Sequence, residues 1–142
     1  MDLFDCARNI NKSHENDVLA RLTTVWGEKL DPEHVLEEYP RPQLKRDNFT
    51  ILNGYWRYAI TRSGDMPTAY DGTILVPFSP ESILSGVERQ LQPNEYLWYE
   101  RGIFITAEDY ASLSSKKLIL HFGAVDQTAL VCLNGRKVCT HT

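Results

Sequence analysis

The stretch ALVCLNGRKVCTHT, Ala129 to Thr142, contains two apolar-rich arms on either side of the pair Asn134-Gly135. An Asn-Gly pair between two such arms is the strongest short-range sign of a β-hairpin with a type I′ turn. We therefore expect one strand from Ala129 to Leu133 and a second from Arg136 to His141. The final arm ends almost where the sequence ends.

A two-residue turn also predicts which side chains meet across the hairpin: Leu133 faces Arg136, Cys132 faces Lys137, and Leu130 faces Cys139. In this register Cys132, Cys139 and His141 point to one face, so a metal site is geometrically conceivable. It lacks a fourth ligand at a recognisable spacing, and diagonal positions are farther apart than the roughly 4 Å between the β-carbons of a disulfide. We expect neither metal nor disulfide, with thiols that pack as small hydrophobic groups.

Four further strands are predicted upstream from short segments that are rich in β-branched and aromatic residues: Gly54 to Thr61, Thr73 to Phe78, Leu97 to Thr106 and Lys117 to Val125. Turn residues separate them, and their spacing favours an antiparallel β-sandwich. A jelly roll uses about eight strands in two sheets, whereas this pattern supplies six. The expected fold is a mainly β, incomplete jelly roll whose remaining strands were encoded after Thr142.

The first 38 residues have a different pattern. Val18, Leu19, Leu22, Val25 and Trp26 recur at spacings of three and four, which predicts a helix from about Glu15 to Glu28, capped by Ser13. Its apolar stripe is expected to pack against the domain that follows. A second, shorter helix is predicted from Asp31-Pro32-Glu33 and ends before Pro40. The expected organisation is a helical lead segment, residues 1–38, and a partial jelly roll, residues 39–142.

Composition narrows the class of protein. Hydrophobic residues make up 42% and charged residues 24%, which is usual for a globular chain. The net charge of −4 gives no positive field for a phosphate backbone or an anionic lipid surface, so nucleic acid and membrane are not expected as partners. The polar N-terminus lacks the features of a signal peptide, and we expect a cytoplasmic protein. No motif suggests a cofactor.

Several motifs, in order, resemble the N-terminal sugar-binding domain of glycoside hydrolase family 2, which includes β-galactosidases, β-glucuronidases and β-mannosidases. They are EEYPRPQLKRDNFTILNGYWRYAI, GTILVPFSPES, YLWYERGIFI and LILHFGAVDQTALVCLNGRKVCTH. The resemblance runs from about Tyr39 to His141. It implies a galactose-binding-domain-like jelly roll that precedes an immunoglobulin-like domain and a (β/α)8 barrel. The two catalytic glutamates of the family lie in that barrel, so no catalytic residue is expected in this chain.

The function implied by the resemblance is support of a glycosidase barrel, together with loops at the edge of the sugar pocket. Sugar contacts usually combine an aromatic ring with carboxylate or amide groups. Glu81, Trp98 and Arg101 are the candidates for contacts with carbohydrate. In the alternative, Trp98 packs in the core, Arg101 pairs with a neighbouring acid, and Glu81 caps a loop.

Two other classes of function stay open at this point. The chain could be a stand-alone carbohydrate-binding module, or a β-sandwich that binds another protein through its N-terminal helix. A sheet without its closing strands exposes an edge and apolar surface. We therefore also expect the isolated chain to self-associate.

Overall fold

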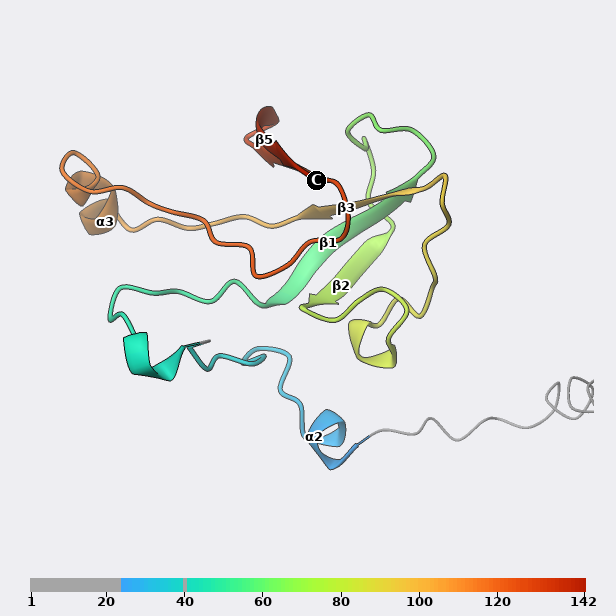
Figure 1. Ribbon diagram of the computed structural model, residues 1–142, viewed down its shortest axis with the longest axis horizontal. Coiled ribbons are helices and arrows are strands. Elements are labelled where there is room, and N and C mark those ends of the chain that lie inside the picture. Colours follow the sequence, from blue (N-terminus) through green and yellow to red (C-terminus); the bar gives the residue numbers. More distant parts are fainter. Residues whose placement is uncertain (1–23, 40) are drawn as a thin grey trace, which may run out of the picture. The chain divides into compact units, whose positions relative to one another are not determined.

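The computed structural model describes residues 24–39 and 41–142 of the chain. The chain divides into two compact units, Met1–Arg101 and Gly102–Thr142. The described parts of both contain antiparallel sheets with short helices between the strands (Figure 1). The β-rich class is confirmed, whereas the jelly-roll arrangement and the boundary at residue 38 stay predictions.

The first unit is organised around a three-stranded antiparallel sheet with the order β2-β1-β3. Its strands are β1 (Gly54–Thr61), β2 (Gly72–Val76) and β3 (Tyr96–Glu100). Strand β1 has the predicted bounds and lies between the other two, as Figure 1 shows. Strand β2 stops directly before Pro77, because proline has no N–H to donate to a ladder.

The core of this unit consists of a few apolar side chains. Ile74 of β2 is 0% exposed, and Ala59, Leu75 and Val35 are also buried. Burial of one such aliphatic side chain stabilises a fold by about 1.5–3 kcal/mol. Ser85, in the 3₁₀ helix η2 (Ile83–Ser85), is buried with its hydroxyl satisfied, since it donates to the Ser82 carbonyl at 2.7 Å.

The predicted N-terminal helix is confirmed only at its end, as α2 (Val25–Glu28). It does not run through Thr24, whose backbone is extended and whose hydroxyl accepts the Gly27 N–H at 3.1 Å as an N-cap. Trp26 is 81% exposed, so its predicted packing against the following domain is wrong. The predicted cap Ser13 and the stripe residues Val18, Leu19 and Leu22 lie outside the described residues.

The second predicted helix, after Asp31, is not formed. Asp31 accepts the Glu33 N–H through its side chain and the His34 N–H through its carbonyl, which makes a local turn. Leu36 then has a φ of 46°, a left-handed conformation that ends any helical continuation. The next regular element is the short 3₁₀ helix η1 (Pro42–Leu44). In the described ranges, no helix combines the length and apolarity required to cross a bilayer.

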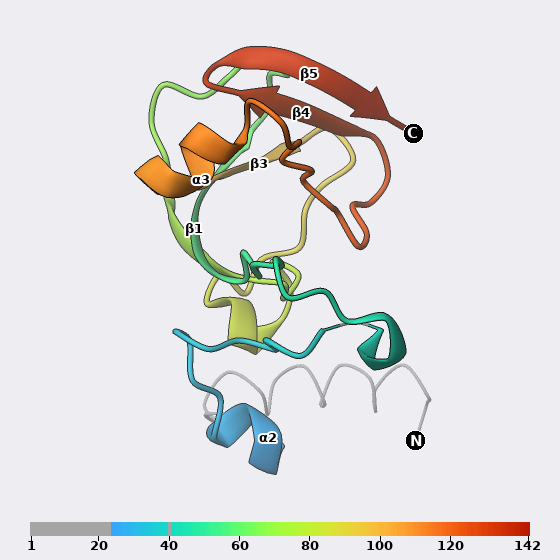
Figure 2. The ribbon, with the colours of Figure 1, turned by 90° about the vertical axis from the view of Figure 1, so that its left-hand side faces the viewer.

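The second unit contains α3 (Ala107–Ser112) and a hairpin of β4 (Ala129–Leu133) and β5 (Arg136–His141). Both strands have the predicted bounds, and their antiparallel arrows are visible in Figure 2. Between Asn134 (φ 50°) and Gly135 (φ 75°) the backbone is left-handed at both positions, as a type I′ turn requires.

Two strand predictions downstream of β2 are wrong, one entirely and one in its second half. Residues 117–125 form no strand, and the strand predicted to reach Thr106 already ends at Glu100. A strand needs a neighbour for its N–H and C=O groups, and these residues pair with none in the described part of the chain. Thr106 instead caps α3 by accepting the Asp109 N–H at 3.0 Å.

Candidate functional site

Trp98 is the aromatic residue predicted to contact carbohydrate. It lies at the centre of β3, opposite Ala59 of β1, and is half-buried. Its indole N–H donates to the Thr61 hydroxyl at 3.1 Å, which fixes the orientation of the ring. Thr61 and Trp98 are diagonal neighbours on one face of the sheet.

Arg101 follows β3 directly and points to the other face. Its Nη1 donates to the backbone carbonyls of Leu52, at 2.9 Å, and Asn53, at 2.6 Å. The guanidinium also lies 6.0 Å from the ring centroid of Trp56. Because these two carbonyls immediately precede β1, Arg101 fixes the point where the chain enters the sheet. The alternative interpretation of the sequence paired Arg101 with a neighbouring acid, but among the described residues Arg101 forms no such ion pair.

Glu81 lies in the loop after β2 and is exposed. Hydrogen bonds from its own backbone N–H and from the Ser79 hydroxyl, with a further one from the Leu91 N–H, hold the pKa of Glu81 below its usual value. Burial raises the pKa of Tyr99, and the negative charge of Glu81 adds to the effect. Glu81 is thus near Tyr99, whose position on β3 faces away from Trp98.

The three predicted contact residues do not form one cluster. Trp98 lies on one face of the β2-β1-β3 sheet, while Arg101 and the surroundings of Glu81 belong to the other. Each makes contacts within the protein that position backbone or loop segments. The structure gives no common surface on which all three could contact one sugar ring.

A polar cluster that the sequence did not reveal lies on the Trp98 face. Arg57 of β1 forms an ion pair with Glu100, its direct neighbour on β3. The Arg57 guanidinium stacks 4.3 Å from the ring centroid of Tyr70. Burial raises the pKa of Tyr70, and the hydrogen bond to Glu100 and the negative charge of Glu100 raise it further. The positive charge of Arg57 partly opposes this rise. The β1–β3 register brings Arg57 and Glu100 together, and Tyr70 comes from the segment before β2, so no local sequence pattern reveals the cluster.

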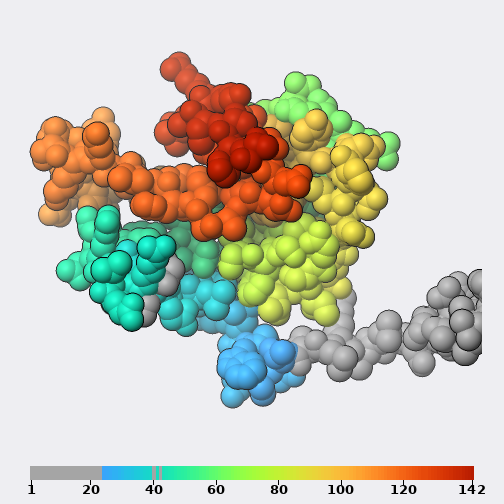
Figure 3. Space-filling view, in the orientation of Figure 1, coloured from blue at the N-terminus to red at the C-terminus, as the bar shows by residue number. Residues whose placement is uncertain are grey.

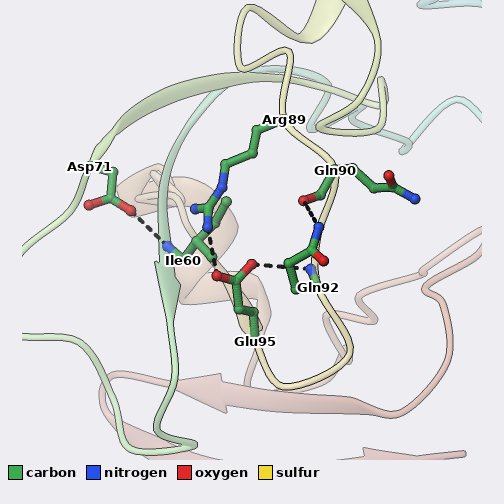
Figure 4. A network of polar contacts seen from close by, with 6 residues as sticks. All are labelled: Ile60, Asp71, Arg89, Gln90, Gln92 and Glu95. Atoms are coloured by element: carbon green, nitrogen blue, oxygen red, sulfur yellow. Dashed lines mark hydrogen bonds and ion pairs between the residues drawn. The ribbon is translucent and has the colours of Figure 1, made fainter.

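Glu95 organises the loop between η2 and β3 (Figure 4). Its carboxylate accepts from Arg89 at 2.6 Å and from the Gln92 N–H at 3.1 Å, and its side chain is only 6% exposed. Nearby, the Asp71 carboxylate accepts the Ile60 N–H at 2.8 Å, which ties the loop before β2 to β1. Both carboxylates hold backbone segments in place.

The hairpin corrects the predicted grouping of Cys132, Cys139 and His141. Leu133 faces Arg136 and Cys132 faces Lys137 as expected, but Cys139 faces Val131 in place of Leu130. A bulge at this point inserts one extra residue in β5 and changes the parity of the strand beyond it. Cys139 and His141 therefore share a face with Val131 and Ala129, and Cys132 lies on the opposite face.

The face that carries Cys139 and His141 borders a shallow concavity of about 540 Å³. Residues 122–126 form its other wall, with Phe122 and Val125 as the large apolar groups and Asp126 as the charged one. Cys132 and Cys139 are both free thiols. Among the described residues, no three or more His, Cys, Asp or Glu side chains are arranged to hold a metal ion.

Comparison with known proteins returns no match, either to a family model or to a curated protein. The order of the sequence motifs and the contacts described above are therefore the basis for any functional assignment.

Proposed function

We propose that this chain is a non-catalytic, jelly-roll-like module of a family 2 glycoside hydrolase, which supports the catalytic barrel and places loops at the edge of the sugar pocket. The observation that carries the proposal is the contact between Arg101 and the carbonyls of Leu52 and Asn53. It joins two of the motifs that resemble the family, ILNGYW and YLWYERG, which lie 48 and 49 residues apart at these contacts.

The arrangement of the carboxylates favours support over catalysis. Retaining hydrolysis of a glycoside requires two carboxyl groups roughly 5 Å apart, one as acid/base and one as nucleophile. Here Glu100 is engaged with Arg57, Glu95 with Arg89, and Asp71 with a backbone N–H. These side chains fix strands and loops, which is the work expected of a supporting module.

The natural transcript and an activity assay test the proposal together. We expect the reading frame to continue past codon 142 into a barrel with two glutamates. Residues 1–142 alone should release no nitrophenol from nitrophenyl β-galactoside, β-glucuronide or β-mannoside. A natural stop codon directly after Thr142 would remove the proposed parent enzyme. Hydrolysis by the chain itself, retained after removal of contaminating enzymes, would contradict the non-catalytic role.

A stand-alone carbohydrate-binding module is the second candidate. Tyr96 is 51% exposed and lies two residues from Trp98, on the same face of β3. Two adjacent aromatic rings can stack on the apolar faces of sugars. Calorimetric titration with galacto-, gluco- and manno-oligosaccharides tests this function, and a Tyr96→Ala variant must lose any binding that depends on this face. Absence of heat with all three ligand series would reject it.

A further inference from the structure

The loop from Arg41 to Phe49 carries the pair Lys45-Arg46 at the surface. Every described side chain in this loop is exposed, and Leu44 is 66% exposed. The residues that follow position 41 appear in teal at the surface in Figure 3. Exposed loops of this kind are the preferred sites of proteolytic cleavage, because a protease must bind several residues of backbone.

The backbone at the pair suits a protease cleft. Lys45 follows η1 with φ −54° and ψ 137°, an extended conformation. Adjacent Lys and Arg side chains present two positive charges, which complement acidic pockets on an enzyme. Arg41, the other cation of this loop, precedes Pro42, and a peptide bond to proline lacks the N–H that a protease normally contacts.

Three other arginines in the described part of the first unit are held by contacts. Arg57 and Arg89 form ion pairs, and Arg101 binds two carbonyls. Arg62 begins a loop that is closed by internal bonds: the Thr61 hydroxyl donates to the Ser63 carbonyl at 2.7 Å, and the Ser63 hydroxyl donates to Asp65 at 2.5 Å. Within residues 24–101, Lys45-Arg46 is the one pair of adjacent basic residues, and both of its side chains are exposed.

The two sides of the loop are joined below the basic pair. The rings of Tyr39 and Phe49 meet edge to face, with centroids 4.6 Å apart. Asn53 donates to the carbonyl of Val35 at 3.0 Å, and Val35 is only 1% exposed. These contacts link residues before the pair to residues after it, so they do not depend on an intact loop.

We propose that Lys45-Arg46 is an endoproteolytic processing site, cut after Arg46 by a protease that recognises paired basic residues, and that the cut chain stays together as one particle. Water is the co-reactant. The Arg46–Asp47 peptide bond breaks, the hydroxyl of water completes a carboxyl group on Arg46, and the remaining proton of water completes an amino group on Asp47. The products are residues 1–46 and 47–142. This proposal is independent of the glycosidase role.

Limited digestion of the full chain tests it, with trypsin in one arm and a subtilisin-like protease specific for paired basic residues in the other. Intact-mass analysis should show fragments 1–46 and 47–142 before any other cut within residues 24–101. The digested chain should elute with the uncut chain on a native sizing column and separate into two fragments in guanidinium chloride.

The double variant Lys45→Gln/Arg46→Gln should lose this cut, and Arg62→Gln, a matched change of an exposed cation in a closed loop, should keep it. A first cut elsewhere within residues 24–101 would overturn the assignment of the site. Cleavage by trypsin but not by the protease specific for paired basic residues would contradict the proposed class of protease. Fragments that separate on the native column would contradict the proposal that the two fragments stay associated.

Discussion

At the scale of single residues, the clearest electrostatic pair is Asp31 and His34. His34 Nδ1 lies 2.8 Å from Asp31 Oδ2, and this hydrogen bond raises the pKa of His34 above its usual 6.5 and lowers the pKa of Asp31 below its usual 3.8. The contribution of His34 to the stability of this turn is lost as pH rises through its raised pKa. That of Asp31 is lost as pH falls through its lowered pKa. The turn is therefore best held between the two values.

Replacement of Asp31 by Asn should move the pKa of His34 back toward 6.5, because the carboxylate that favours the imidazolium is gone. An NMR titration of the His34 ring protons measures the shift. The variant Glu38→Gln changes a nearby charge that does not perturb His34 and is the control. An unchanged titration in Asp31→Asn would show that the pair does not form in solution.

Arg101 allows a test of a single structural contact. Arg101→Gln removes the guanidinium that binds the carbonyls of Leu52 and Asn53, and it should destabilise the first unit by about 1 kcal/mol, a low value for charged hydrogen bonds because the site is exposed. Urea unfolding, followed by tryptophan fluorescence to which Trp56 beside it contributes, measures the change. Arg62→Gln should leave the midpoint within error. Equal midpoints for both variants would contradict the role given to Arg101.

At the scale of elements, the type I′ turn decides the hairpin. Gly135 has a φ of 75°, and a side chain there is strained even though no atom lies within 4 Å of an added Cβ. Gly135→Ala should reduce hairpin stability by about 1 kcal/mol. Cross-strand NMR contacts between Leu133 and Arg136 report the hairpin population. Gly123→Ala, at a position that is equally open but lacks the positive φ, should leave these contacts unchanged.

The elements that the sequence could predict are those with local causes. Asn134-Gly135 and its apolar arms were sufficient to place β4 and β5, and a segment rich in aromatic and β-branched residues placed β1. The segment Lys117 to Val125 has the composition of a strand, but a strand also needs a partner, which composition cannot supply. The extra residue in β5 likewise depends on how two strands meet, and it moved Cys139 to the face opposite Cys132.

The candidate site was harder to predict than the strands. Trp98 and Arg101 differ by three positions, so an extended chain directs them to opposite faces, and parity alone could have separated them. The location of Glu81 beside Tyr99 depends on the path of a loop, which no local sequence pattern predicts. The ion pair of Arg57 and Glu100 required the β1–β3 register, which joins residues 43 positions apart.

At the scale of the whole molecule, exposed apolar side chains dominate the behaviour we expect in solution. Phe104 is 100% exposed and Leu118 67% exposed, and a two-stranded sheet such as β4–β5 is only marginally stable by itself. Exposed apolar surface favours association, so sedimentation velocity should show an average mass that rises with concentration across the micromolar range. The double variant Phe104→Ser/Leu118→Ser should weaken this rise, and Thr128→Ser should not. A wild-type chain that stays monomeric over that range would show that these side chains do not drive self-association.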